Sequence, residues 1–500
     1  MGLVISYPYP YPTFGYQEKP EPEPIPGDSG ERKLTDGYGS VVVGSEVSGS
    51  DIVAVGTNGE EVEVVVCGER RDDIEEPLWG QWRRRNNGDT FHGGNNEGRH
   101  KHKPSEGNHD DATPFLAPMA ALYLPISMLA LIVVVSLGLW SGVQGAPQVP
   151  CYFIFGDSLV DNGNNNQLQS LARADYLPYG IDFPGGPSGR FSNGKTTVDA
   201  IAELLGFDDY IPPYADASGD AILKGVNYAS AAAGIREETG QQLGGRISFS
   251  GQVQNYQSTV SQVVNLLGNE DSAANYLSKC IYSIGLGSND YLNNYFMPQF
   301  YSSSRQYSPD EYADVLIQAY TEQLKTLYNY GARKMVLFGI GQIGCSPNEL
   351  AQNSPDGKTC VEKINSANQI FNNKLKGLTD QFNNQLPDAR VIYVNSYGIF
   401  QDIISNPSAY ANNMNSQSSV DMNQSSGFSV TNAGCCGVGR NNGQITCLPM
   451  QTPCQNRREY LFWDAFHPTE AGNVVVAQRA YSAQSASDAY PVDIQRLAQI

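Results

Sequence analysis

One serine, Ser158, stands where the chain could present a nucleophile. It lies in the stretch Phe155 to Asn166, where Gly156 and Asp157 separate it from the apolar run Tyr152 to Phe155. This run has the composition of a buried strand. A serine at the carboxyl end of such a strand is displayed where open α/β sheets bind ligands. Gly-Asp-Ser also favours a turn for backbone reasons alone, so the tripeptide does not identify a catalytic site by itself.

The same tripeptide occurs earlier, in Gly27-Asp28-Ser29-Gly30. Taken alone, this earlier copy is similar to the nucleophile segment of trypsin-like proteases. It follows a Pro/Glu run and has no apolar strand before it. We therefore exclude it as a nucleophile.

A catalytic serine needs a base, and histidine is the usual one because its pKa lies near neutrality. Of the chain's 5 histidines, His467 is the one that follows residue 145, so a Ser-His mechanism in this part must use it. Asp464 precedes it by three residues, and in a turn its carboxylate can meet one ring nitrogen while the other faces Ser158. The alternative is that Asp464 caps the following helix and His467 is an ordinary surface residue.

Two further segments could stabilise an oxyanion, which requires preorganised hydrogen-bond donors. Gly225 to Ile235 ends in a small-residue turn with Gly234, and Gly287-Ser288-Asn289-Asp290 follows the next expected strand. Each could be only a loop. Their placement after successive strands favours a shared site.

The part of the chain after residue 150 alternates short apolar runs with longer amphipathic segments, which predicts a doubly wound parallel α/β sandwich. The predicted strands are Tyr152 to Phe155, Val226 to Ala229, Ile281 to Ile284, Lys334 to Phe338 and Val391 to Asn395. The predicted helices are Thr196 to Leu205, Val253 to Leu267, Pro309 to Tyr330, Val361 to Gln385 and one that begins at Thr469.

The chain of 500 residues has a formal net charge of −20. Residues 1–145 hold 11 Lys and Arg against 21 Asp and Glu, and residues 146–500 hold 21 against 31, so each part is ten units negative. Such acidity excludes nucleic acid as an expected partner, because binding phosphates needs clustered basic residues. Residues 146–500 suffice for one large α/β domain.

The first 118 residues are expected to be a low-complexity, disordered extension, or to lie upstream of the true start. Two short β-like runs, Val41 to Val43 and Val62 to Val66, interrupt a polar sequence that buries too little apolar surface to fold. Residues 119–145 combine an apolar core, Ile126 to Trp140, with small residues near Gly145. This pattern favours a cleaved signal peptide that starts at Met119 over an uncleaved signal anchor.

Cysteine usage indicates an oxidising compartment. Cleavage near Gly145 would leave eight of the 9 cysteines, an even number that permits complete disulfide pairing. We expect Cys345 to pair with Cys360. A zinc site formed by Cys435, Cys436, Cys447 and Cys454 is a weaker alternative, because the usual two-residue-spaced pairs are missing. Asn423-Gln424-Ser425 is an acceptor sequence for N-glycosylation.

Taken together, the four blocks resemble those of the GDSL esterase/lipase family, in the plant-type, secreted branch of the SGNH hydrolases. The resemblance covers about residues 150–480 and rests on Phe155 to Ser158, Gly234, Gly287 to Asp290 and Asp464 to His467, in the order of the family. It implies a flavodoxin-like α/β/α fold with a mainly parallel sheet. Residues before Met119 have no counterpart in the family pattern.

The resemblance also implies roles for individual residues. Ser158 would be the nucleophile, His467 the base and Asp464 its orienting acid. The oxyanion hole would comprise the Ser158 and Gly234 backbone N–H groups and the Asn289 side chain. Because Ala231-Ala232-Ala233 stands where many relatives have glycines, Ala232 or Ala233 is an alternative donor.

We therefore expect a secreted serine esterase/lipase that hydrolyses acyl esters of a small molecule, lipid or polymer, without a metal or organic cofactor. It would act as a monomer and contact membranes only through an uncleaved signal segment. One alternative is an acyltransferase that uses the same residues with a hydroxyl acceptor. Another is a non-catalytic extracellular protein on the same fold.

Overall fold

The structure is a computed structural model that describes residues 32–34, 41–43, 146–411 and 427–500. The chain divides into two units, and the first two described segments belong to the smaller one. There β1 (Arg32–Leu34) pairs antiparallel with β2 (Val41–Val43), the second of which was predicted as a short β-like run. The Val62 to Val66 run, residues 119–145 and Asn423 lie outside the described residues.

The larger unit is built on a sheet whose described strands have the order β3-β4-β5-β6-β9. Its first four strands are parallel and the short β9 pairs antiparallel with β6. The strands are β3 (Tyr152–Gly156), β4 (Ile281–Gly285), β5 (Lys334–Phe338), β6 (Arg390–Val394) and β9 (Ala489–Tyr490). Four of the five predicted strands are therefore confirmed.

The predicted strand Val226 to Ala229 was wrong as a regular strand. The segment runs beside β3, where Tyr228 N–H donates to the Ile154 carbonyl over 2.8 Å, but it forms only isolated bridges. Its outer neighbour is Pro212-Pro213, and prolines have no N–H to donate to a ladder. The segment still delivers the residues after Ala229 to the carboxyl end of β3.

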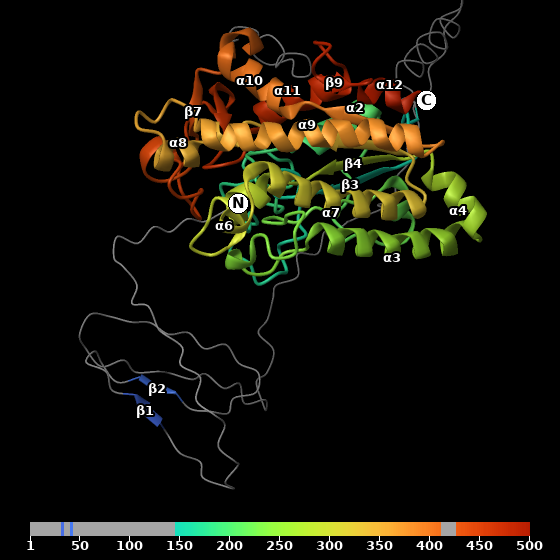
Figure 1. Ribbon diagram of the computed structural model, residues 1–500, viewed down its shortest axis with the longest axis horizontal. Helices are drawn as coiled ribbons and strands as arrows, with labels where there is room; N and C mark the ends of the chain where they lie inside the picture. The colour runs from blue at the N-terminus through green and yellow to red at the C-terminus, as the bar shows by residue number, and fades with distance from the viewer. Residues whose placement is uncertain (1–31, 35–40, 44–145, 412–426) are drawn as a thin grey trace, which may run out of the picture. The chain divides into compact units, whose positions relative to one another are not determined.

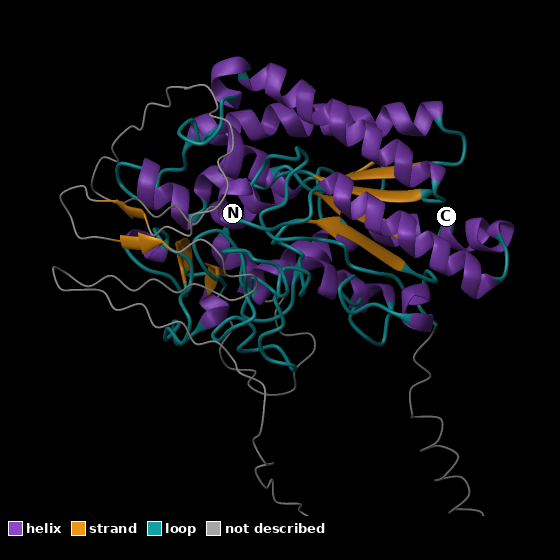
Figure 2. Cartoon of the chain, turned by 90° about the horizontal axis from the view of Figure 1, so that it is seen from below, coloured by secondary structure: helices purple, strands orange, loops and turns teal. Residues whose placement is uncertain are grey.

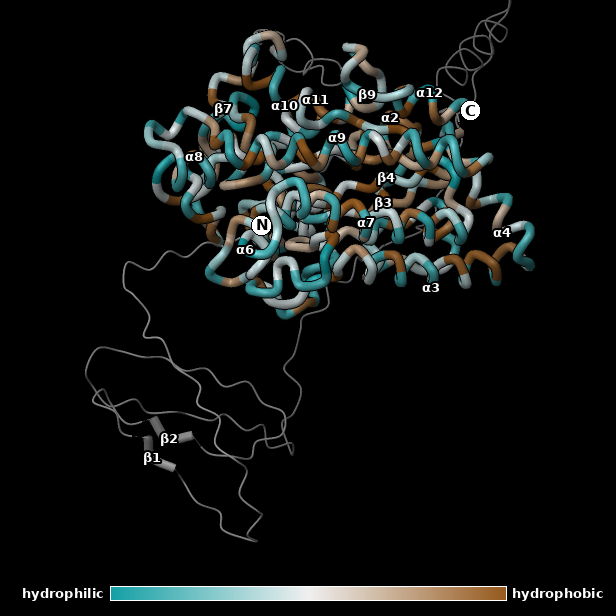
Figure 3. The backbone as a smooth tube through the Cα atoms, in the orientation of Figure 1, coloured by the Kyte–Doolittle hydropathy of each residue, from teal (hydrophilic) through white to brown (hydrophobic). Residues whose placement is uncertain are grey.

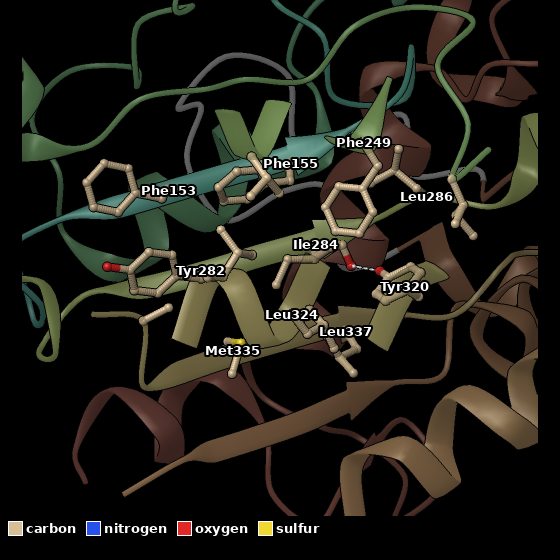
Figure 4. Close-up of a cluster of buried hydrophobic side chains, with 14 of the residues drawn as sticks. Phe153, Phe155, Phe249, Tyr282, Ile284, Leu286, Tyr320, Leu324, Met335 and Leu337 are labelled. Atoms are coloured by element: carbon tan, nitrogen blue, oxygen red, sulfur yellow. Dashed lines mark hydrogen bonds between the residues drawn. The ribbon is translucent and has the colours of Figure 1, made fainter. Parts of the chain in front are cut away.

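Alternate residues of the strands face opposite sides of the sheet and bury two separate cores. One face carries Phe153, Phe155, Tyr282 and Ile284 from β3 and β4 (Figure 4). Three long helices cover it: α3 (Phe249–Leu267), α7 (Pro309–Asn329) and α9 (Glu362–Gln385). Helix α3 begins four residues earlier than predicted because Ser248 caps it, accepting from the Gly251 N–H over 3.3 Å.

The opposite face carries Tyr152, Ile154, Val336 and Ile392. It is covered by α2 (Thr197–Leu205), α10 (Ser396–Ser405), α11 (Glu470–Tyr481) and α12 (Ile494–Ala498). The result is the expected α/β/α sandwich with a mostly parallel sheet, in which helices lie on both sides of the strands (Figures 1 and 2). Hydrophobic and hydrophilic residues alternate along the helices, as the hydropathy colouring shows (Figure 3), which is the pattern expected of helices that cover a core.

Shorter elements fill the connections. The remaining described α-helices are α4 (Glu270–Leu277), α5 (Ser288–Asp290), α6 (Ser303–Gln306) and α8 (Pro347–Asn353). A second small sheet, which the sequence did not predict, pairs β7 (Val430–Gly434) parallel with β8 (Tyr460–Phe462). Many of these connections gather beyond the end of the main sheet to which the strand arrows point (Figure 2).

Within the described ranges, eight cysteines form disulfides. The expected Cys345–Cys360 pair is confirmed, and Cys151 pairs with Cys280. The four cysteines considered for zinc are joined as Cys435–Cys454 and Cys436–Cys447, so that alternative was wrong because no thiolate is left to bind a metal. Of the helices in the described part, none combines the length and apolarity needed to cross a membrane.

Candidate active site

Ser158, His467 and Asp464 lie in one hydrogen-bonded row at the carboxyl end of β3. His467 Nε2 is 3.0 Å from Ser158 Oγ, and His467 Nδ1 is 2.7 Å from both carboxylate oxygens of Asp464. Ser158 lies two residues after the end of the strand, while the other two come from the turn that follows β8. The fold thus brings together side chains that are 309 positions apart in the sequence.

The local structure around Asp464 is a tight turn rather than a helix cap. Its Oδ1 accepts the backbone N–H groups of Phe466 at 2.9 Å and His467 at 2.8 Å. Helix α11 has its own cap, Thr469, whose side chain accepts the Gly472 N–H over 3.2 Å. His467 is also buried. The alternative of a capping aspartate and a surface histidine is therefore wrong.

The environment of Asp464 favours its ionised form. Burial acts to raise the pKa of this carboxyl, whereas the charge interaction and hydrogen bond with His467 act to lower it. The Tyr179 hydroxyl, which donates to Asp464 Oδ2 over 2.6 Å, and the Phe466 N–H act in the same direction. The net result is a pKa below the ordinary range of an aspartate, so the carboxylate stays charged beside the imidazole.

The turn after Ala229 holds its backbone N–H groups in a fixed arrangement. Ala231 N–H donates to Asp161 Oδ2 over 2.9 Å, Ala233 N–H to the Ser230 carbonyl over 3.1 Å, and Ile235 N–H to Asp290 Oδ2 over 2.8 Å. Within this described turn, the N–H groups of Ala232 and Gly234 make no such bond. The Ala233 N–H is therefore already used within the turn, which leaves Ala232 and Gly234 as the candidate oxyanion donors of this segment.

Ala232 adopts a backbone conformation that alanine rarely takes. Its φ is +64°, in the left-handed region where a Cβ is unfavourable. The residue is fully buried, and a Cβ on Gly240 would lie 2.2 Å from its carbonyl oxygen. This geometry gives a physical reason for the glycines that the family resemblance places along this stretch.

Asn289 is the middle residue of the short helix α5, which follows β4. Its amide nitrogen donates to the Ala233 carbonyl over 2.9 Å and lies 3.4 Å from Asp157 Oδ2, and its amide oxygen accepts from Asn293 over 2.7 Å. These contacts join the Asn289 block to the Ala233 turn and to the residue before Ser158. The amide is therefore fixed in orientation, as an oxyanion donor must be.

Three buried polar residues that the sequence analysis did not assign hold these segments in place. Asp161 accepts from Gly163, Asn164 and Ala231, and Asp290 accepts from Ile235, Arg236 and the Thr239 hydroxyl. Asn165 accepts from the Ser230 hydroxyl over 2.6 Å. Burial raises the pKa of Asp161 and of Asp290 to about 6, against the hydrogen bonds, which lower it. All three lie inside the blocks singled out from the sequence, and that position is the signal that could have found them.

The described residues contain no cluster of His, Cys, Asp or Glu arranged to hold a metal ion. What the site does contain is a hydroxyl, an imidazole, a carboxylate and fixed backbone and amide donors. This set can perform acyl transfer through a covalent intermediate.

A family model described as GDSL-like Lipase/Acylhydrolase matches residues 152–480. The chain belongs to this family. It is 70% identical over 357 residues to GDSL esterase/lipase At1g29670 of Arabidopsis thaliana, which covers 71% of this chain and 93% of the relative. It is 65% identical over 375 residues to GDSL esterase/lipase At5g45670 of the same plant, which covers 75% and 99%.

These matches confirm the GDSL family predicted from the sequence, and the family is consistent with the α/β fold described above. This GDSL protein is a carboxylic ester hydrolase, as expected. The family match begins at Tyr152, the first residue of β3, and includes the segments that carry Ser158, Asn289 and His467.

Proposed function

We propose that this GDSL enzyme hydrolyses acyl esters with Ser158 as nucleophile, His467 as general base and Asp464 as the acid that orients it. The observation that carries the proposal is the row of contacts, 3.0 Å from His467 Nε2 to Ser158 Oγ and 2.7 Å from Nδ1 to Asp464. A base within hydrogen-bond reach of a serine, itself held by a carboxylate, is the arrangement that activates a hydroxyl.

In the first half of the reaction, Ser158 Oγ attacks the acyl carbonyl while its proton passes to His467 Nε2. The tetrahedral oxyanion is stabilised by the Asn289 amide and by the backbone N–H groups of Ser158 and of Gly234 or Ala232. The intermediate then collapses, the bond to the alcohol breaks, and the leaving alkoxide takes the proton from His467. An acyl-Ser158 ester remains.

In the second half, His467 removes a proton from a water molecule, which attacks the acyl-Ser158 carbonyl. Collapse of this second intermediate releases the carboxylic acid and returns the proton to Ser158 Oγ. Throughout, the ionised Asp464 holds the imidazole in one tautomer and stabilises its protonated form. The cycle needs no metal or organic cofactor.

Labelling by a fluorophosphonate tests the proposal, because such a probe phosphonylates only an activated serine. We expect the label on the peptide that contains Ser158, and much slower labelling of a His467→Ala variant that remains folded. Label on a different serine would contradict the assignment of Ser158. No label on a folded wild-type protein would contradict a serine mechanism and would leave a non-catalytic role on the same fold. Product analysis with competing alcohols distinguishes hydrolysis from acyl transfer to a hydroxyl.

We also propose that the enzyme is secreted. The support comes from the four disulfides of the described residues and from the apolar sequence between Met119 and Gly145. N-terminal sequencing of the mature protein tests this, with a start near Ala146 expected. A mature chain that retains residues 119–145 would instead support an anchored form.

A further inference from the structure

An apolar pocket lies beside the three residues of the proposed acyl-transfer site. Leu159 follows Ser158, Ser288 precedes Asn289 and Phe466 precedes His467, and all three line the pocket. The pocket is therefore lined by direct chain neighbours of the nucleophile, the oxyanion donor and the base. Another part of its wall comes from helices α2, α10 and α11, which cover one face of the sheet.

The wall of the pocket is chemically uniform. Most lining side chains are aliphatic or aromatic, and none of them carries a charge. Several polar residues in the wall are already paired within the protein, since Ser283 Oγ is 2.7 Å from the Tyr152 hydroxyl and the Thr197 hydroxyl donates to Asn473 over 3.1 Å. Of the buried polar side-chain atoms without a partner in the described residues, none belongs to this wall. A sugar or a second carboxylate would lose its hydrogen bonds to water in this pocket without new partners, whereas a hydrocarbon chain has none to lose.

We infer that this pocket holds the acyl chain of the substrate, so that the enzyme prefers esters of straight-chain aliphatic acids longer than butyrate. This inference rests on the proposed function, because the pocket acquires its meaning from the reaction at Ser158. The acyl chain passes Leu159 and Phe466 and extends towards Phe400 and Phe462. The centroids of these two rings lie 6.4 Å apart, and their planes differ by 28°. Each methylene that leaves water for the pocket raises kcat/KM by up to about fourfold.

Gly341 offers a way to shorten the pocket without touching the catalytic groups. It lines the wall, and a Cβ added there would lie 3.4 Å from the Phe400 ring, an ordinary contact. Larger atoms beyond that Cβ would fill the space towards the ring. Gly377 is the matched control, because it is exposed on α9 and a Cβ there meets nothing within 4 Å.

The test compares kcat/KM for p-nitrophenyl acetate, butyrate and octanoate, each as a monomer in solution. We expect wild type and Gly377→Leu to prefer octanoate over acetate by about tenfold or more. Gly341→Leu should lower the ratio of the octanoate to the acetate kcat/KM by about tenfold relative to wild type. Adding Phe400→Ala to Gly341→Leu should restore octanoate hydrolysis, because removing the ring reopens the space.

A Gly341→Leu profile parallel to that of wild type, or a wild-type preference for acetate, would overturn the inference. Inactivation of the wild-type enzyme by octyl and by ethyl fluorophosphonate provides a measurement that needs no variant, and equal rates would also overturn it. Failure of the proposed function looks different, because Ser158→Ala would then still hydrolyse acetate. The pocket and the catalytic assignment can therefore fail separately.

Discussion

The hydroxyl of Tyr179 donates a 2.6 Å hydrogen bond to Asp464 Oδ2, the carboxylate that contacts His467. Both side chains are buried, and 285 positions separate them in the sequence. Tyr179 packs edge-to-face against Trp463 and Phe191, and the Phe191 ring lies 4.9 Å from that of His467. An aromatic cluster therefore supports both the Asp464 carboxylate, through the Tyr179 hydroxyl, and the His467 ring, through Phe191.

Replacing Tyr179 by phenylalanine removes this donor and keeps the ring. We expect kcat to fall by roughly tenfold with KM little changed, since the hydroxyl positions Asp464 and does not touch substrate. A hydrogen bond to a charged group contributes about 1.5–3 kcal/mol, so the free energy of unfolding should fall by a similar amount. Steady-state kinetics and urea denaturation measure the two effects. A rise in KM alone would contradict the positioning role.

Asn289→Ala tests the oxyanion donor. Loss of one such donor costs on the order of 10²- to 10³-fold in kcat, because the interaction strengthens as charge develops. Asn383→Ala is the control, since the Asn383 side-chain amide hydrogen-bonds the Val391 backbone N–H and carbonyl, each over 2.8 Å, in the helix α9 and strand β6 region. The control should lose stability and keep kcat. Equal kcat values for the two variants would exclude Asn289 as a donor.

Ala232→Gly tests the strain in the turn after Ala229. Because glycine adopts φ +64° without a Cβ penalty, the variant should gain up to about 1 kcal/mol in the free energy of unfolding. Ala232→Val should lose stability, because a β-branched residue is disfavoured in this region. Thermal denaturation measures both. A glycine variant clearly less stable than wild type would show that the alanine conformation is unstrained.

The pH dependence of stability tests the charge on Asp464. Its folded-state pKa is depressed, so its contribution to stability is present above the unfolded pKa of about 3.9 and is lost as the pH falls through the folded value. The unfolding free energy of wild type minus that of Asp464→Asn should shrink as the pH falls from about 5 to about 3. A difference that grows as the pH falls over this acid range would contradict a depressed pKa.

Much of the fold could be predicted because its helices and strands are strongly periodic. The helices from Pro309 and from Glu362 carry apolar residues at helical spacing and end within two residues of prediction. The wrong or missing strand predictions concern segments whose pairing depends on residues far away in the sequence. Val226 to Ala229 has the composition of a strand but lies against two prolines, and the short β7 becomes a strand only by pairing with β8.

The residues of the candidate site could be predicted where few residues of the required type are present. A single histidine after residue 145 determined the partner of Ser158, whereas 29 tyrosines gave no reason to select Tyr179. Three of the disulfides were equally open, because spacing does not reveal which cysteines meet. Ala232 was noticed through the family resemblance, but its left-handed backbone became visible only in the folded turn.

Ester hydrolysis by the Ser158→Ala variant tests the central claim most directly. With p-nitrophenyl butyrate as substrate, we expect kcat to fall by on the order of 10⁵-fold or more. The circular dichroism spectrum and melting temperature should remain those of wild type, because the hydroxyl is replaced by hydrogen at one position. A folded Ser158→Ala protein that hydrolyses the ester as fast as wild type would contradict the account.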